Sequence, residues 1–519
     1  MHKREKIFHK IIAAIFGIMM FLILTINIVV DHRVDYLCKN DIYFNNFVLL
    51  LMGLGLFIVI MFLYKKIIEK QIGKLNKKQC QYILIIGCFI MLLIQIYVSK
   101  RIFFLTGWDA GKLRNISISL SKGINLNDAG DDYLVLNPNN TFLTFIFTII
   151  CKIALKIGKN PEFLLTLGSV LSVNLSLYFI TKCAGELTNN KNVCVFCFGI
   201  FSMYIALSPW NVIPYSDTYA MCFTTMILYS YLIKERMNKN LSWFIIYVLS
   251  FVGYLVKPTV IIVLIAILIL EIVHFLFYKK NKSLKDVLKN SFIFLLSILT
   301  FLIVNSSSQK FIGYEGNKDY AKPMTHYLMM GLNSKTCGVF SSEDTTFTDS
   351  IVGKDNKING NIKVIKTRLN KFGISGYLNF LEKKLLVIYN DGTFAWSVEG
   401  MFYEDTSITD ENDFLKRYFY SSGDKYKLFV TCQQMTWITL ILFIIISLKN
   451  TTYVNKKLHV ILLTIVGITI FLLLFEARAR YLLLYAPYYV LLASIGISNV
   501  HGDNRIKCLF KKVEKNNYI

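Results

Sequence analysis

The sequence contains few charged residues and little proline. Only 17% of its 519 residues are charged and 7 are proline, whereas 55% are hydrophobic and 14% are aromatic. Soluble domains carry about 25% charged residues, and the mean hydropathy of this chain is +0.50. These values exclude an ordinary soluble protein and predict an all-α membrane protein with many spans.

Cysteines are present, but they lack the paired spacing of a disulfide framework or a zinc site. Of the 11 cysteines, Cys194 and Cys197 form a C-x-x-C pair inside an apolar run, where packing of small side chains accounts for them. A signal-peptide cleavage site is missing as well, because the basic start M-H-K-R-E-K leads into apolar residues 7–30 with no small-residue motif after them. We therefore expect this first apolar stretch to remain as a span.

The net charge of +24 could indicate a nucleic-acid partner. The 57 Lys and Arg residues, against 33 Asp and Glu, gather mainly in short clusters between apolar stretches. The positive-inside rule produces this pattern in membrane proteins. We therefore assign the charge to membrane topology and predict the lipid bilayer, rather than nucleic acid, as the partner.

Thirteen apolar stretches come close to the roughly 20 residues that a spanning helix needs. They are 8–30, 47–64, 81–99, 141–157, 162–181, 192–208, 215–233, 243–256, 259–278, 289–304, 427–448, 457–475 and 480–498. The basic connections between them, and the basic tail, belong in the cytoplasm, so both termini lie there and the number of spans is even. We predict about 12 transmembrane helices, with 141–157, which contains Lys152 and Lys156, as the stretch that does not cross.

The same topology places the other polar connections together on the extracytoplasmic face. They are the loop 101–140, the turn 209–217, Lys257-Pro258, the segment 306–426 and the run E-A-R-A-R at 476–480. This convergence predicts a single site on that face. The predicted parts are an N-terminal transmembrane module (1–305) with a catalytic outer loop (101–140), an extracytoplasmic soluble segment (306–426), C-terminal transmembrane helices (427–498) and a basic cytoplasmic tail (499–519).

Asp109 is the first candidate for chemistry, in the run G-W-D-A-G-K-L-R that follows a long apolar stretch. A carboxylate at the membrane edge could take the proton of a hydroxyl or amine acceptor, and the nearby Lys112 could neutralise a phosphate leaving group. Trp108 beside it is a candidate for substrate contact. The alternative is that Asp109 caps a helix at the membrane edge.

Lys257 is a single lysine within nearly 40 apolar residues, next to the helix-breaking Pro258. A lysine at such a break pairs most naturally with a phosphate or an aspartate, although it could also extend to the membrane interface. Asp217, in P-Y-S-D-T, opens an apolar helix; it is either a helix cap or a substrate contact.

The run F-E-A-R-A-R-Y places positive charge on the outer face, against the positive-inside tendency. A bound phosphate explains this placement. One arginine, Arg478 or Arg480, would hold the phosphate, while the other pairs with Glu476. Tyr481 is a further candidate for substrate contact.

Other polar residues allow a functional and a structural interpretation. Asp131 and Asp132, with Asp128, form either a carboxylate or divalent-cation site or a solvated loop, and the Asp-Ala-Gly turn favours the loop. His326 and Asp391 are candidates for substrate contact, but a lone histidine is usually structural and Asp-Gly usually forms a turn. We predict no cofactor, with a divalent cation at the aspartates as the alternative.

Taken in order, these motifs resemble the bacterial members of the GT-C glycosyltransferase superfamily, the group that includes protein O-mannosyltransferases and lipid A aminoarabinose transferases and a branch called glycosyltransferase family 39-like. The resemblance extends over most of residues 81–490. The motifs are G-W-D-A-G, P-Y-S-D-T, K-P-T, H-Y-L-M-M-G-L-N and E-A-R-A-R-Y. The Asp-Glu pair of the mannosyltransferases is absent, because Ala110 follows Asp109, which argues against that subtype and a protein acceptor.

The resemblance implies an inverting transferase of the bacterial plasma membrane that uses a polyprenyl-phosphate sugar on the extracytoplasmic side. Asp109 would be the base, and Lys257, Arg478 and Arg480 would hold the lipid phosphate. The acceptor would be a cell-envelope glycan such as a teichoic acid or wall polysaccharide. The alternatives are a flippase or transporter for a lipid-linked saccharide, a polysaccharide polymerase, and a non-catalytic membrane scaffold.

Overall fold

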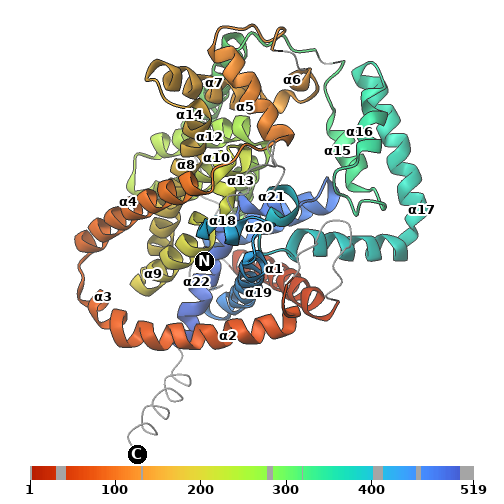
Figure 1. Cartoon of the computed structure of the whole chain (residues 1–519). Helices are drawn as coiled ribbons and strands as arrows, with labels where there is room; N and C mark the ends of the chain where they lie inside the picture. Colours follow the sequence, from red (N-terminus) through yellow and green to blue (C-terminus); the bar gives the residue numbers. More distant parts are fainter. Residues whose placement is uncertain are drawn as a thin grey trace, which may run out of the picture.

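The computed structural model describes residues 3–30, 42–129, 132–277, 284–317, 319–400, 413–451 and 457–502 (Figure 1). Within these ranges the regular structure is helical, and no β-strand occurs. The prediction of an all-α protein is therefore confirmed for the described part of the chain. The basic tail beyond residue 502 and Asp131 lie outside the described residues.

Long helices make up most of the molecule, and shorter ones connect them. The long helices are α1 (Lys3–Val29), α2 (Asn46–Leu63), α4 (Lys77–Arg101), α7 (Thr141–Lys156), α8 (Pro161–Thr188), α12 (Lys239–Val256), α13 (Ile261–Phe277), α14 (Leu284–Phe311), α17 (Lys354–Tyr389), α19 (Tyr426–Thr451), α20 (Leu458–Leu474) and α22 (Ala486–Gly502). The shorter ones are α3 (Lys70–Lys74), α5 (Trp108–Ser121), α6 (Tyr133–Leu136), α9 (Lys191–Phe201), α10 (Ser216–Tyr219), α11 (Met221–Ile233), α15 (Met324–Gly331), α16 (Ser342–Asp349), α18 (Phe414–Phe419) and α21 (Arg480–Leu483).

All thirteen predicted apolar stretches fall on helices. In the described ranges, nine helices are long and apolar enough to cross a membrane, and Lys191–Ala206 and α20 are shorter apolar helices. The stretch 141–157, which is predicted not to cross, falls on one of these nine, Pro138–Lys156. The chain is thus a multi-pass membrane protein, while the total of about 12 spans stays a prediction.

The lipid-facing surface is clearest on α2 and α4. Large apolar side chains such as Leu51, Ile58 and Phe89 are exposed there. In water such a surface would be unfavourable, whereas in a bilayer it contacts lipid tails. In contrast to α2 and α4, α22 is buried and packs closely against α19. A Cβ on Gly496 of α22 would lie 1.9 Å from the carbonyl oxygen of Phe443. Small residues allow helix backbones to approach in this way.

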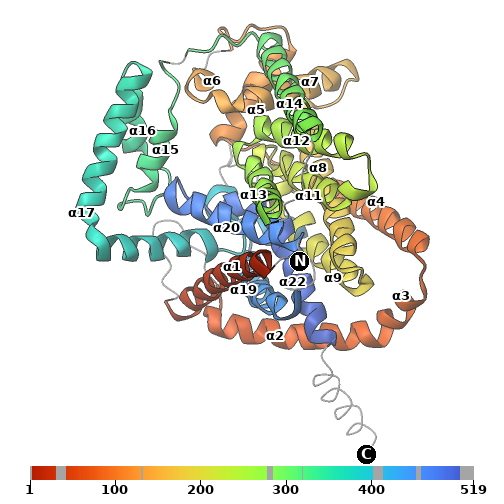
Figure 2. The same ribbon diagram turned by 180° about the vertical axis from the view of Figure 1, so that it is seen from behind.

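Helices α15, α16 and α17 lie together at one side of the helical bundle in both views (Figures 1 and 2). They belong to the 306–426 segment, and a small apolar core of Met329, Leu332, Ile365 and Phe380 joins α15 to α17. Arg368 on α17 binds both carboxylate oxygens of Asp344 on α16, at 2.6 and 3.0 Å. The 306–426 segment therefore has packing of its own.

Two polar contacts fix this segment to the bundle. The fully buried ammonium of Lys384 donates to the carbonyl oxygens of Gly331, Leu473 and Phe475 at 2.7, 2.9 and 2.6 Å, which satisfies the C-terminal end of α20. Next to the end of α17, Asn390 accepts hydrogen bonds from Asn46 of α2 and from Gln434 of α19. The end of α17 is thus joined to three helices of the bundle.

The buried His326 on α15 makes the 306–426 segment sensitive to acid. Its Nδ1 lies 2.8 Å from the hydroxyl of Thr348 on α16, and burial lowers the pKa of the imidazole to about 4. The unfolded pKa is about 6.5, so the folded segment favours the neutral ring. Its contribution to stability is complete above pH 6.5 and is lost as the pH falls from 6.5 towards 4, by up to about 3 kcal/mol.

We expect proteolysis and amide exchange in α15–α17 to increase between pH 6.5 and pH 4.5. His326→Asn keeps a donor near Nδ1 but cannot titrate, so this acid sensitivity should shrink in the variant. An equally steep pH dependence in His326→Asn would show that another group is responsible.

Candidate functional site

A pair of opposite charges, Lys257 and Asp217, lies buried where two helices are interrupted. The Lys257 ammonium is 2.6 Å from Oδ1 of Asp217, and the two residues are 8% and 2% exposed. Lys257 ends α12 in an extended conformation, because Pro258 has no N–H to continue the helix. Asp217 lies in α10, which follows the P-Y-S turn. The lysine found by sequence therefore pairs with the aspartate that we had considered separately.

Arg480 extends this pair toward a second group of charges. Its Nε is 3.5 Å from Oδ2 of Asp217, and its Nη1 is 3.3 Å from Oε2 of Glu399. Glu399 also binds Arg478 at 2.5 Å, and Arg478 binds Glu476 at 2.9 Å. We call these six residues the charged cluster: Asp217, Lys257, Glu399, Glu476, Arg478 and Arg480.

The charges of the cluster balance, but its hydrogen bonds are incomplete. Three cations face three carboxylates. Nevertheless Oδ2 of Asp217, Oε2 of Glu399 and Nε of Arg480 are buried without a hydrogen-bond partner. Buried polar atoms are normally hydrogen-bonded, so these three atoms could bind a polar ligand or water.

Aromatic rings surround the Arg480 guanidinium. Its centre lies 4.3 Å from the ring centroid of Trp108, 5.4 Å from that of Tyr215, 5.6 Å from that of Tyr481 and 5.9 Å from that of Trp210. The Lys257 ammonium lies 5.0 Å from the ring centroid of Tyr481. The rings exclude water from the cations, and their π faces stabilise the positive charge.

Asp109 lies next to these rings, on the exposed side. The hydroxyl of Tyr215 donates to its Oδ2 at 3.5 Å, and the Tyr215 ring packs edge-on against Trp108 with centroids 4.8 Å apart. The cap residue of α5 is Gly107, and no side chain caps this helix. Asp109 is therefore an exposed carboxylate in the first turn of α5, and both Asp109 and Arg480 contact Tyr215.

Two phenols adjoin this carboxylate. Burial raises the pKa of Tyr133 and of Tyr215, and the charge of Asp109 raises both further. Both hydroxyls are thus protonated at neutral pH. Lys112 is exposed, with its ammonium 5.5 Å from the centroid of the Tyr133 ring. Lys112 therefore faces solvent and is not a member of the charged cluster.

Other residues predicted as candidates for substrate or metal binding lie outside the charged cluster. Asp391 is buried, and its oxygens accept from the backbone N–H groups of Thr393 and Ala395 and from the Thr393 hydroxyl, which stabilises a turn. His326 bonds within the 306–426 segment. Asp132 is exposed before α6. The described residues include no group of three or more His, Cys, Asp or Glu placed to hold a metal ion, and Asp131 lies outside them.

Sequence analysis did not single out Glu399, Trp210 or Tyr215. Glu399 lies in W-S-V-E-G, a run with no recognisable motif, and reaches the cluster only because the 306–426 segment folds back onto the bundle. Trp210 and Tyr215 lie in the turn 209–217, which was predicted to face the site, but nothing in that turn marked the aromatics as contacts for arginine. The indole of Trp210 donates to the carbonyl of Thr393 at 3.0 Å, which joins the turn to the same segment.

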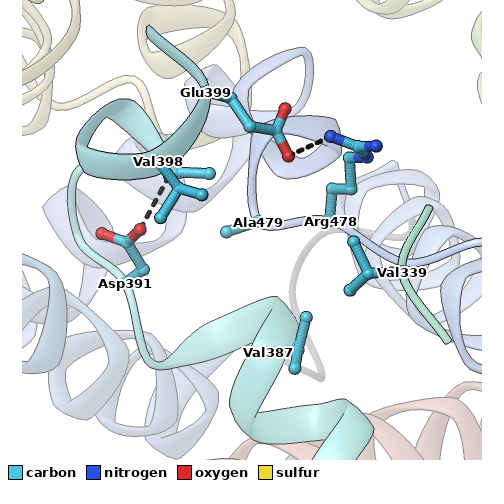
Figure 3. A pocket seen from close by; sticks show the side chains of 8 residues that line it. Val339, Val387, Asp391, Val398, Glu399, Arg478 and Ala479 are labelled. Atoms are coloured by element: carbon cyan, nitrogen blue, oxygen red, sulfur yellow. Dashed lines mark hydrogen bonds and ion pairs between the residues drawn. The ribbon is translucent and has the colours of Figure 1, made fainter. Parts of the chain in front are cut away.

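A small pocket borders the charged cluster (Figure 3). It is lined by Val339, Val387, Asp391, Ala395, Val398, Glu399, Arg478 and Ala479. Glu399 and Arg478 point toward one another at its edge, and Asp391 with five apolar side chains forms the rest of the wall (Figure 3). The pocket therefore lies between the 306–426 segment and the run 476–480.

Comparison with known proteins places the chain in a family without adding a function. No curated protein matches it. Two solved structures of ArnT from Cupriavidus metallidurans, one bound to undecaprenyl phosphate and one in the apo state, are distantly similar in structure, with TM-scores of 0.30 and 0.29. Each is 11% identical, and the match covers 80% of this chain and 77% of ArnT. A family model described as "Conserved hypothetical integral membrane protein" matches residues 2–501, and the chain belongs to that family.

Proposed function

We propose that this protein is an inverting glycosyltransferase that moves a sugar from a polyprenyl-phosphate carrier to a cell-envelope glycan. One observation carries the proposal: the exposed carboxylate of Asp109 accepts from Tyr215, and the buried Arg480 lies against the rings of Tyr215 and Trp108. A base and a phosphate-binding cation are the two groups that such a transfer needs, and here they contact the same aromatic pair. The motif order that resembles the GT-C transferases supports the same function.

In the proposed reaction, Asp109 takes the proton of an acceptor hydroxyl. The acceptor oxygen then attacks the anomeric carbon from the face opposite the phosphate, so that a glycosidic C–O bond forms with inversion. The bond between the anomeric carbon and the phosphate oxygen breaks, and its electron pair leaves with the polyprenyl phosphate. Arg480 and Lys257 stabilise the negative charge that develops on the phosphate. The surrounding aromatic rings exclude water, which strengthens that interaction.

The positive-inside pattern of the sequence supports an extracytoplasmic site in the plasma membrane with both termini in the cytoplasm. The lysine clusters at 65–78 and 234–239 connect helices at one end of the spans. The charged cluster lies where α12 ends at Lys257 and α20 ends before Glu476, at the other end of those helices. Under this topology the polyprenyl chain would lie among the apolar helices while the sugar faces the 306–426 segment.

The direct test is the release of polyprenyl phosphate by the purified full-length protein. The protein in detergent is supplied with a panel of radiolabelled polyprenyl-phosphate sugars and an envelope-glycan acceptor. Acceptor-dependent release and a labelled glycan product support the proposal. Binding of donors without any release would contradict a transferase and favour a flippase for lipid-linked saccharides.

The charge of α17 supports an anionic acceptor such as a teichoic acid. Residues 354–389 include eight Lys or Arg and only two acidic residues. Lys363, Lys366 and Lys371 are exposed, and they make no ion pair within the described part of the chain. Exposed cations on the segment that faces the site suit a polyanion.

Replacing Lys363, Lys366 and Lys371 together with glutamine should weaken acceptor binding and leave donor binding unchanged. Each exposed contact contributes about 0.5 kcal/mol, so we expect the KM for an anionic acceptor to rise about tenfold. The matched control changes Lys74, Lys77 and Lys78, which are also exposed but lie at the end of α3 and the start of α4. An equal rise in KM for both triple variants would mean that net charge, rather than α17, determines acceptor binding.

A further inference from the structure

Arg478 and Arg480, the two arginines proposed to hold phosphate, are already engaged by carboxylates. Arg478 binds Glu476 through Nε and Glu399 through Nη1. Arg480 faces Asp217 and Glu399. A phosphate that bonds through these same N–H groups must therefore displace a carboxylate. This requirement follows from the proposed function and concerns the same site.

Among the three carboxylates, Glu399 is the one placed to move. Asp217 is held by Lys257 at 2.6 Å, and the Glu476 carboxylate contacts Nε of Arg478, so its movement would release only one of the two arginines. Glu399 contacts both arginines, but its Oε2 is 3.3 Å from Arg480 and has no hydrogen-bond partner. It bridges the two cations with one well-made contact and one poor one.

The backbone next to Glu399 and the space beside it also favour movement. Glu399 lies in a π-helical turn (Trp396–Gly400), directly after Phe394 and Ala395, which have positive φ values of 56° and 63°. Non-glycine residues in this region carry backbone strain, which is common at switching and ligand-binding positions. The pocket of Figure 3 adjoins the Glu399 side chain, so the carboxylate is not packed against protein on every side.

We infer that Glu399 and the donor phosphate compete for Arg478 and Arg480, so that Glu399 sets how tightly the site holds a polyprenyl phosphate. A phosphate offers more acceptor oxygens than a carboxylate and can bond both guanidinium groups at once. It would also satisfy Nε of Arg480, which Glu399 and Asp217 leave without a hydrogen bond. After transfer, the return of Glu399 to the arginines would help the product to leave.

The test measures binding of farnesyl phosphate to the full-length protein in detergent, with farnesol as the control for the chain alone. Glu399→Gln removes the competing charge, and we expect the Kd for farnesyl phosphate to fall at least tenfold. Glu476→Gln makes the same chemical change but leaves Glu399 bridging the arginines, so its Kd should change less than threefold. Glu399→Asp keeps the charge on a shorter side chain and should give an intermediate affinity, which decides the question if Glu399→Gln does not fold.

The outcomes separate this inference from the proposed function. Equal gains in Glu399→Gln and Glu476→Gln would reduce the effect to net charge and overturn the competition. Unchanged or weaker binding by Glu399→Gln, with normal binding by the wild type, would overturn it as well while the donor class stands. Farnesyl phosphate bound no better than farnesol by any variant would overturn both the phosphate-lipid donor and the role of Glu399.

Discussion

Asp109→Asn should nearly eliminate sugar transfer while donor binding is retained. A general base contributes about 10²- to 10⁴-fold to the rate, and asparagine cannot accept the proton of the acceptor hydroxyl. The substitution is nearly isosteric and the side chain is exposed, so the fold should be unaffected. The measurement is kcat for acceptor-dependent release of polyprenyl phosphate, together with the Kd for the donor.

Asp128→Asn is the matched control, because Asp128 is an exposed aspartate of the same loop with no contact to the aromatic pair. Its kcat should stay within about twofold of the wild-type value, as exposed substitutions usually do little. If Asp109→Asn kept its transfer rate, the base would have to be another carboxylate, with Asp132 or Asp217 as the next to test. The assignment of the base would then be wrong even if the enzyme class were right.

Lys257→Met should cause the largest loss of stability. The substitution leaves the buried Asp217 with only the poorly aligned contact to Arg480. Removing one partner of a buried ion pair costs about 3–5 kcal/mol. The free energy of unfolding in a detergent titration is the measurement, and Lys112→Met, an exposed lysine-to-methionine change, is the control with an expected effect of about 0.5 kcal/mol or less.

The double variant Lys257→Met/Asp217→Asn tests whether the two charges are coupled. Because the second substitution removes the unpaired carboxylate, most of the lost stability should return. Losses that simply add would show that Lys257 is stabilised by something other than Asp217. Lys257→Met should also bind polyprenyl phosphate poorly, and in the double variant stability should recover while this binding stays weak.

Sequence was sufficient to predict the helices, because a long apolar run is a local property. All thirteen predicted stretches coincide with helices, and Lys257 was found because Pro258 interrupts such a run. The run 476–480 was recognised for the same reason, since its charges stand out between apolar neighbours. The pairing of Arg478 with Glu476, at 2.9 Å, was among the arrangements considered from sequence.

Glu399 could not be found in this way. Its contacts with Arg478 and Arg480 connect residues about 80 positions apart and depend on how the 306–426 segment docks. That segment has ordinary composition, so neither its docking contact at Lys384 nor its turn around Asp391 has a local signal. Asp391 is the opposite case. The sequence made it a candidate for substrate contact, but its carboxylate accepts hydrogen bonds from its own turn.

The three carbonyl contacts of Lys384 determine how substrates can reach the site. If the 306–426 segment swung away from the bundle as a rigid lid, Lys384 would keep its bond to Gly331 of the same segment, but the carbonyl oxygens of Leu473 and Phe475 would lose the ammonium together. Each buried group left unpaired costs about 1–3 kcal/mol, so such an opening would be rare at physiological temperature. The segment is therefore better described as a fixed wall, and under the proposed function a lipid-borne donor would enter sideways, from the bilayer.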